Sequence, residues 1–257
     1  MTKVTNFIKK IFSIFNYKIE HVKSWYKRQE NYLAEIEESD FNFLKKINKF
    51  TMSTPANHWT IIQSLQHIKK NNIEGDLVEC GVYKGGNIIL FDYLLEKYQL
   101  SKKIFAYDTF EGMSEPSDIY IHIKNNLPSQ TKKNYEKNNI VWCYASLDEV
   151  KNNIKKFNLQ FENKFKFIKG DVLKTLKVKD NLPEKISLLR LDTDFYESTK
   201  IELEVLFPRL VKNGILIIDD YGHWKGAKKA VDEYFNLKEN FKWLHRIDYA
   251  SRLLIKN

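Results

Sequence analysis

Short apolar runs alternate with segments of helical spacing from about residue 58 to the end of the sequence. Apolar runs bounded by glycine or aspartate predict strands, here at residues 76–80, 104–107, 165–168, 186–191, 215–218, 243–247 and 252–255. Apolar residues that recur every three or four positions predict helices, here at residues 59–68, 87–98, 147–157, 198–210 and 227–235. Strands separated by single helices form βαβ units. The pattern therefore predicts an α/β domain, a mostly parallel sheet with helices on both faces.

The first 50 residues follow a different pattern. Between Val4 and Ile19 the apolar residues fall on one side of a helical wheel, and residues 1–28 carry six Lys and one Arg against a single Glu. Such a basic amphipathic helix packs on its own domain or on a second subunit, or it lies on an anionic membrane surface. We expect an N-terminal amphipathic helical extension over residues 1–50. The main domain then covers residues 51–257, with a lid-like insertion around residues 112–145.

Composition excludes several classes of protein. The 257 residues are 43% hydrophobic and 14% aromatic, enough for a packed core and against wholesale disorder. Cys80 and Cys143 cannot form a disulfide framework or a zinc site, so a reducing cytoplasm is expected. No apolar run reaches the roughly 18 residues of a membrane span, and no signal peptide is recognisable. The net charge of +9 would suit RNA, but no RNA-binding motif accompanies it.

Acidic residues stand at or next to the end of each of the first five predicted strands. Parallel strands place their carboxyl ends on one edge of the sheet, where α/β folds bind their ligands. Like charges gathered there need a cation or hydrogen-bond donors, although any one acid could simply cap the following helix. The acids concerned are Glu79, Asp108, Asp171, Asp192 and the pair Asp219 and Asp220.

The first strands favour a nucleoside ligand that carries a cationic centre. The turn after Glu79 contains three glycines but lacks the GxGxxG spacing of a pyrophosphate cradle. Asp108 lies where Rossmann-like folds hold a ribose diol, and Asp171 could accept a hydrogen bond from an adenine amino group. A ribose and a cation without a pyrophosphate describe S-adenosylmethionine better than NAD.

The later strands suggest a metal site. Asp192, Asp219 and Asp220 offer three carboxylates without a Cys or His at ligand spacing, which suits a hard cation, Mg²⁺ first. Asp194 shares a face with Asp192 if the strand continues and would then be an outer partner. Asp219 and Asp220 converge only if their strand breaks, which Gly222 permits. The alternative is a capping pair plus a surface acid.

Motifs in a fixed order extend over residues ~51 to 255. They are Thr51–Ser53, Gly75–Gly86, Ala106–Gly112, Ser146–Val150, Leu189–Thr199, Pro208–Leu210, Ile218–Gly222 and His245–Asp248. On these motifs the sequence resembles the macrocin-type O-methyltransferase family, metal-dependent class I enzymes that act on macrolide sugars and on the noviose of aminocoumarins. The sequence departs from the family pattern at Thr193, where Gly is usual, at Asp171-Val172, where an aromatic pair is common, and over residues 115–145.

The resemblance implies a seven-stranded Rossmann-like methyltransferase sheet, S-adenosylmethionine as donor, Mg²⁺, and a sugar hydroxyl as acceptor. The acceptor sugar would belong to a glycan, a nucleotide-sugar or a glycosylated natural product. By position in the motifs, the metal would be held by Asp192, Asp219 and Asp220. The donor would be held by Met52, Ser53, Glu79, Gly81, Tyr83, Asp108, Thr109, Gly112 and Asp171, with Met52 and Ser53 closing over it.

The proton acceptor and the acceptor's charge stay open. Asp192 is the first candidate for the base and His122 the second, whereas His223 and His245 are interpreted as structural. Residues 121–170 hold ten Lys against four acids, which indicates an anionic acceptor or only a solvated surface. The alternatives in other classes are an RNA methyltransferase and a non-catalytic membrane-associated scaffold. We expect a cytoplasmic homo-oligomer without a nucleic-acid partner, and membrane association is left open.

Overall fold

The computed structural model describes residues 35–113, 143–157, 164–240 and 242–257. The chain divides into two units, residues 1–37 and Glu38–Asn257, and the description that follows concerns the second. His122, most of the predicted insertion and the amphipathic stretch from Val4 to Ile19 lie outside the described residues. No helix among the described residues is long and apolar enough to cross a membrane.

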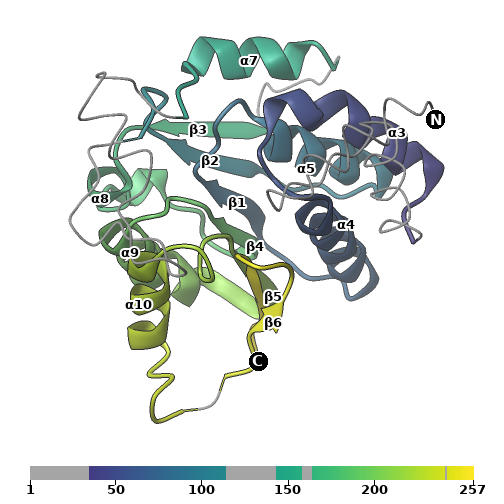
Figure 1. Ribbon diagram of the computed structural model, residues 1–257. Coiled ribbons are helices and arrows are strands. Elements are labelled where there is room, and N and C mark those ends of the chain that lie inside the picture. The colour runs from purple at the N-terminus through teal and green to yellow at the C-terminus, as the bar shows by residue number, and fades with distance from the viewer. Residues whose placement is uncertain (1–34, 114–142, 158–163, 241) are drawn as a thin grey trace, which may run out of the picture. The chain divides into compact units, whose positions relative to one another are not determined.

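A seven-stranded, mostly parallel sheet forms the centre of this unit, as predicted (Figure 1). Its order is β3-β2-β1-β4-β5-β7-β6, and only β7 runs antiparallel, to both β5 and β6. The strands are β1 Asp76–Cys80, β2 Ile104–Asp108, β3 Phe165–Lys169, β4 Ile186–Leu191, β5 Leu210–Ile218, β6 His245–Arg246 and β7 Arg252–Ile255. Strand order reverses between β1 and β4, so a crevice opens at their carboxyl ends.

Helices cover both faces of the sheet. In Figure 1, α3, α4 and α5 lie together on one side and α9 and α10 on the other, while α7 lies beside β3. The α-helices are α3 Glu38–Ile47, α4 Pro55–Lys70, α5 Gly86–Lys97, α7 Leu147–Lys155, α8 Val172–Thr175, α9 Tyr196–Leu206 and α10 Lys225–Tyr234. Short 3-10 helices are η1 Asn48–Phe50, η2 Lys179–Asn181 and η3 Phe207–Arg209.

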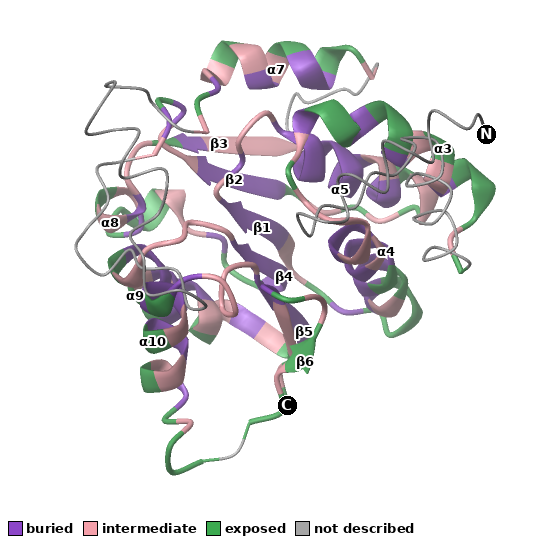
Figure 2. Cartoon of the chain, in the orientation of Figure 1, coloured by how far each residue is buried: buried purple, intermediate pink, exposed green. Residues whose placement is uncertain are grey.

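The central strands β1 and β4 are buried except at Asp76, the first residue of β1, because helices cover both faces of the sheet (Figure 2). All six residues of β4 are buried, including Arg190, the one charged side chain in a strand that otherwise reads Ile-Ser-Leu-Leu-Leu. A buried guanidinium requires acidic or carbonyl partners. The strand therefore brings a cation to the same edge of the sheet as the predicted acids.

Several predicted boundaries shift for local reasons. Helix α4 begins at Pro55, four residues before its first predicted position, because the Thr54 side chain caps it and proline is tolerated in the first turn. Helix α9 ends at Leu206, since Pro208 lies in the 3-10 turn that follows. The sequence pattern missed α8, a single turn that Asp171 caps.

The predicted boundary between extension and domain, at residues 50 and 51, differs from the division at Glu37 and Glu38. Residues 38–50 form α3 and η1, and Leu44, Ile47 and Phe50 are buried in the larger unit. An acidic residue of α3 also contributes to this packing. Asp40 is buried and accepts hydrogen bonds from Tyr93 and Lys97 of α5, at 2.9 and 2.6 Å.

Candidate active site

A cavity of about 440 Å³ opens at the carboxyl ends of the central strands. It lies at the reversal of strand order between β1 and β4, the place at which α/β sheets bind ligands. Most of the residues predicted from sequence line it, namely Met52, Ser53, Gly81, Tyr83, Asp108, Thr109, Gly112, Asp171, Asp192, Asp219 and Asp220. Glu79 does not, and the reason lies in its partners.

The turn after β1 requires a glycine. Gly81 has φ +85°, and a Cβ there would lie 1.9 Å from the backbone oxygen of Asp192. The Asp192 N–H also donates to the Cys80 carbonyl at 2.9 Å, so the end of β4 packs directly on this turn. Because only glycine adopts this backbone at such close approach, Gly81 joins the two strands that border the crevice.

Asp108, at the end of β2, fixes the same turn. One carboxyl oxygen accepts from the N–H groups of Val82 and Tyr83, at 2.7 and 3.1 Å, and the other from Phe110 N–H at 2.7 Å. Burial raises the pKa of this carboxyl, while these hydrogen bonds oppose the rise. The two N–H groups on one oxygen fill its lone pairs, whereas the other oxygen has, besides Phe110, only a long bond of 3.4 Å from the Thr109 hydroxyl. That second oxygen is the one able to receive a ribose hydroxyl from the cavity that Asp108 lines.

Glu79 lies behind the cavity wall. It is fully buried, and its Oε1 accepts from Asn87 at 3.0 Å and from Arg190 at 2.9 Å. Its Oε2 has no hydrogen-bond partner among the described residues. Burial raises the pKa of Glu79 to about 8, although Arg190 acts to lower it. Direct contact between Glu79 and the donor stays a prediction, and Asn87 is the neighbour that does line the cavity.

Asp171 is both a helix cap and a residue of the cavity wall, the two roles that the sequence left open. Its carboxyl accepts from Leu173 N–H at 2.9 Å as the cap of α8. It also lines the cavity next to Gly170. Capping occupies part of its acceptor capacity, so its contact with an adenine group stays a prediction.

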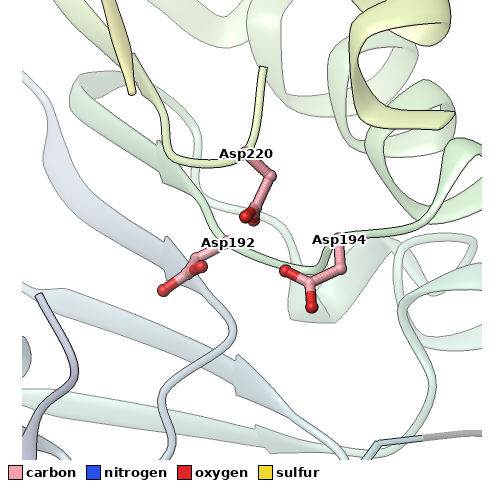
Figure 3. A group of neighbouring side chains, drawn as sticks. All are labelled: Asp192, Asp194 and Asp220. Atoms are coloured by element: carbon pink, nitrogen blue, oxygen red, sulfur yellow. The ribbon is translucent and has the colours of Figure 1, made fainter. Parts of the chain in front are cut away.

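Three aspartates converge beside these residues (Figure 3). Asp192 and Asp194 follow β4, Asp220 follows β5, and one carboxylate oxygen of each lies within 4.8 Å of the others. Asp194 reaches this position with φ +65°, a left-handed conformation that Asp tolerates better than most residues.

This trio differs from the predicted one, which contained Asp219 in place of Asp194. The Oδ1 of Asp219 instead accepts from Arg190 at 2.9 Å and from the Ser251 hydroxyl at 3.0 Å. Neighbouring residues of an extended chain point to opposite sides, which separates Asp219 from Asp220. Both still line the cavity, so the metal-ligating role of Asp219 stays a prediction.

The aspartates are crowded and under-compensated. Burial, followed by the charges of Asp194 and Asp192, raises the pKa of Asp220 well above its usual range, and burial and Asp192 raise that of Asp219 to about 7. The buried Oδ2 of Asp220 has no hydrogen-bond partner among the described residues. A hard divalent cation would satisfy this oxygen and stabilise the ionised forms. The residues therefore fit Mg²⁺.

Arg190 is the functional residue that the sequence motifs did not single out. Its Nη1 donates to Glu79 at 2.9 Å and to Asp192 at 2.6 Å, and its Nη2 donates to Asp219 at 2.9 Å and to Ser53 at 3.2 Å. The signal was present in the sequence, because an arginine inside an apolar strand needs acidic partners.

Beyond the aspartates the cavity wall becomes aromatic. Phe195, Trp224, His223 and Tyr249 line it together with Met113. The Tyr249 hydroxyl and His223 Nδ1 form a hydrogen bond of 2.9 Å, so His223 belongs to the cavity wall, whereas the exposed His245 in β6 does not. Apolar surface next to hydrogen-bonding acids suits a hydroxylated ring with one apolar face.

Comparison with known families gives one match that extends over most of the chain. The family described as Macrocin-O-methyltransferase (TylF) matches residues 43–254. This stretch contains strands β1 to β6, all of β7 except Ile255, and every cavity residue discussed above.

Individual relatives have related descriptions. The chain is 29% identical over 209 residues to a demethyldecarbamoylnovobiocin O-methyltransferase of Streptomyces niveus, a match over 76% of this chain and 74% of the relative. It is 30% identical over 175 residues, 66% of this chain and 61% of the relative, to an 8-demethyl-8-(2,3-dimethoxy-alpha-L-rhamnosyl)-tetracenomycin-C 4'-O-methyltransferase of Streptomyces olivaceus.

Solved structures agree with this fold. The O-methyltransferase NovP superposes with a TM-score of 0.68 at 27% identity, covering 80% of this chain and 82% of NovP. A calicheamicin methyltransferase superposes with a TM-score of 0.62 at 18% identity, covering 86% and 93% of the two chains.

Proposed function

The chain belongs to the macrocin O-methyltransferase family, and we propose that it methylates a sugar hydroxyl with S-adenosylmethionine as donor and Mg²⁺ as a required ion. The observation that carries this proposal is the position of Asp192, Asp194 and Asp220, which converge in the same cavity as the glycine turn after β1. One cavity would then hold the nucleoside of the donor and a hard cation side by side.

The donor would lie against the ends of β1 and β2. Asp108, itself held by the turn that follows β1, would accept the ribose hydroxyls, and Gly81 leaves room for close approach of the ligand to the backbone. Met52 and Ser53 would close over the donor from the loop before α4. This arrangement orients the donor and excludes water from its reactive end.

The aspartates would hold the ion. Asp192 and Asp220 belong to both the predicted and the observed trio, and either Asp194 or Asp219 would complete the set. When bound, Mg²⁺ lowers the pKa of a hydroxyl that it ligates, and S-adenosylmethionine supplies an electrophilic methyl group. Asp192 is the first candidate to take the hydroxyl proton on its carboxylate. His122, the second candidate, lies outside the described residues.

The acceptor would lie between the aspartates and the aromatic wall. The relatives' names describe enzymes that act on glycosylated natural products or their sugars. A sugar on such a product, on a glycan or on a nucleotide fits this pattern. The ten Lys between residues 121 and 170 favour an anionic acceptor, and a nucleotide-sugar is the simplest compound of that kind.

Labelled-methyl transfer tests the proposal. The purified chain is incubated with methyl-labelled S-adenosylmethionine, with UDP-, GDP- and dTDP-sugars and with neutral glycosides, in Mg²⁺ or in excess EDTA. We expect label in a sugar only with Mg²⁺, with a loss on the order of 100-fold or more in EDTA. Full turnover in EDTA contradicts the metal requirement, and transfer only to neutral glycosides contradicts the anionic acceptor.

We also propose a cytoplasmic homo-oligomer in which residues 1–28 contact a membrane surface. Cys80 and Cys143 are both free thiols, which suits a reducing compartment. The six Lys and one Arg of residues 1–28 favour anionic lipid. Light scattering on the purified chain measures the oligomeric state, and a monomer at micromolar concentration contradicts that part of the proposal.

A further inference from the structure

The loop Thr51–Thr54, which precedes α4, is held by hydrogen bonds to residues of other segments. Ser53 Oγ accepts from Asn87 Nδ2 at 3.0 Å and from Arg190 Nη2 at 3.2 Å. The Thr54 hydroxyl donates to Asp248 at 2.8 Å, on the loop that also carries Ser251. Met52, at the tip, is 61% exposed. Thr51 also donates to Asn87 Oδ1, at 3.4 Å, so Asn87 holds the loop at two points and Ser53 is the loop residue that contacts Arg190.

Arg190 connects this loop to the acids. On the donor side its guanidinium donates to Glu79 and Ser53, and on the metal side it donates to Asp192 and Asp219. The Arg190 side chain is 1% exposed, so water does not compete for these bonds. A planar guanidinium presents its donors in a rigid fork, so a shift toward one pair of acceptors alters its geometry with the other pair.

Its four partners come from four different segments. Glu79 lies in β1, Ser53 in the loop before α4, Asp192 after β4 and Asp219 after β5. A buried arginine that served only to neutralise one acid would need one partner. Arg190 instead spans the boundary between the residues assigned to the donor and the residues assigned to the ion.

We propose that Arg190 is a positioning residue that couples the two ligands, so that a divalent ion on the aspartates strengthens donor binding and the donor strengthens binding of the ion. A cation that engages Asp192 or Asp219 competes with the guanidinium for their charge. Arg190 then interacts more strongly with Glu79 and Ser53, which fixes the loop over the donor. This inference rests on the proposed function and extends it to the cooperativity between its two ligands.

Binding of S-adenosylhomocysteine measures the coupling without turnover. Its sulfur is neutral, so direct repulsion between the donor's sulfonium and the ion does not enter the measurement. Titration calorimetry gives Kd for S-adenosylhomocysteine with and without Mg²⁺, and Kd for Mg²⁺ with and without S-adenosylhomocysteine. We expect each ligand to tighten the other by the same factor, about 5-fold or more, as linkage requires.

Two variants assign the coupling to Arg190 and the loop. In Arg190→Lys one flexible ammonium replaces the fork, so we expect the factor to fall below about 2-fold. In Ser53→Ala the core arginine is intact and only the loop contact is lost, so the factor should fall there as well. If Arg190→Lys does not fold, Ser53→Ala alone tests whether the loop contact carries the coupling. Ser53 lies in a surface loop, so this variant should fold.

Ser187→Ala is the matched control. Ser187 is buried at the other end of β4 and donates to the Gly75 carbonyl at 2.9 Å, so this variant also loses a serine hydroxyl but far from the ligands. It should keep the full coupling factor. A weaker donor site alone would raise Kd in both conditions and leave the ratio unchanged, so the ratio separates coupling from simple loss of affinity.

The outcomes separate this inference from the function on which it rests. A wild-type chain that binds neither ligand overturns the proposed function. A wild-type chain that binds both ligands with affinities independent of each other overturns the coupling alone. Full coupling in Arg190→Lys and in Ser53→Ala overturns the assignment to Arg190.

Discussion

At the scale of single residues, Asp192 belongs both to the hydrogen bonds around Arg190 and to the three converging aspartates. Its Oδ2 accepts from Arg190 at 2.6 Å, and its carboxylate is also one of the three that converge. Under the proposed function, a residue in this position would orient the arginine, offer a ligand oxygen to the ion and be close to the acceptor. Its substitution therefore separates chemistry from donor binding.

Asp192→Asn should abolish turnover while donor binding survives. The amide keeps an acceptor oxygen for Arg190 but is neither a base nor an anionic ligand, so we expect kcat to fall about 1000-fold or more. Calorimetry with S-adenosylhomocysteine alone should give a Kd within a few fold of the wild-type value. Asp180→Asn, an exposed acid in η2, is the control and should keep full activity. Normal turnover in Asp192→Asn removes Asp192 from the site.

His58 makes folding stability depend on pH. It is buried in α4, and its Nε2 has no hydrogen-bond partner among the described residues. Burial, followed by the charge of Arg190, lowers the pKa of His58 from 6.5 to about 4. Below pH 6.5 the unfolded chain binds a proton that the native chain does not, so stability falls as pH drops from 6.5 to about 4.

A His58→Gln variant isolates this effect. Over that pH range the wild-type chain should lose up to about 3 kcal/mol more of its unfolding free energy than the variant does. Urea unfolding at pH 7, 5.5 and 4.5 measures the difference. Parallel pH curves for the two proteins would mean that His58 titrates normally in the fold.

The sequence located the acids at this scale but did not determine their partners. Asp192 and Asp220 could be placed from strand ends alone, since parallel strands end on one edge. The choice between Asp194 and Asp219 depends on side-chain direction after each strand breaks, and on Arg190, which draws Asp219 away from the trio. Those interactions join residues on different strands, so no local pattern contains them.

At the scale of elements, the site depends on how closely strand ends and turns approach each other. Gly81 brings the turn after β1 against the backbone of Asp192, and a Cβ at Gly222, after β5, would lie 2.1 Å from the Tyr249 carbonyl. These two contacts fix the glycine turn and the loop 248–251 against the ends of β4 and β5. Small additions there should disturb the site more than larger changes elsewhere.

Gly81→Ala should damage both stability and ligand binding. The new Cβ meets backbone, which cannot move aside as a side chain does, and φ +85° is strained for alanine. We expect a loss of about 2–5 kcal/mol in unfolding free energy and loss of S-adenosylhomocysteine binding. Gly226→Ala in α10, where the nearest atom is 3.1 Å from the new Cβ, should have a smaller effect. Equal effects on unfolding and binding in both variants would contradict this account.

Elements with a strong local signal were predicted best. The strands 76–80, 186–191 and 252–255 have the predicted limits because apolar runs end at turn residues. Strand β5 begins at Leu210, five residues before its predicted start, although Lys212 and Asn213 interrupt the apolar run. Pairing with β4 and β7 keeps β5 in a strand despite these polar residues. Such pairing joins distant parts of the chain, so it cannot be predicted from local periodicity.

At the scale of the whole molecule, the net charge and the packed core lie in different parts of the chain. Residues 1–28 carry most of the net charge of +9, whereas the fold and the cavity belong to the unit Glu38–Asn257. The larger unit buries its own core, including Leu44 and Ile47 of α3. The proposed methyl transfer and the proposed membrane contact should therefore be separable.

A chain reduced to residues 38–257 tests that separation. It should unfold within a few degrees of the full chain and bind S-adenosylhomocysteine with similar affinity, because the cavity lies within this unit. Sedimentation with vesicles that contain anionic lipid should pull down the full chain at low salt but not the shorter one. Equal sedimentation of both chains would mean that residues 1–28 are not the membrane contact.

The fold class was predictable from the alternation of strands and helices, and the seven-stranded sheet was implied by the resemblance to a family. The edge of the sheet that carries the cavity was predictable from the parallel strand ends, whereas the strand order came from the structure. The aromatic wall was not predictable, because Phe195, Trp224 and Tyr249 come from separate segments that meet only in the folded chain.

The hydrogen bond between Thr54 and Asp248 joins residues 194 positions apart, and that between Ser251 and Asp219 closes the same loop onto the end of β5. Contacts of such long sequence separation carry a loop-closure cost in entropy, so we expect them to form late during refolding. Refolding followed by tryptophan fluorescence would then report a collapsed core before ligand affinity returns. The catalytic pocket would be the last region to mature and the first to open under denaturing stress.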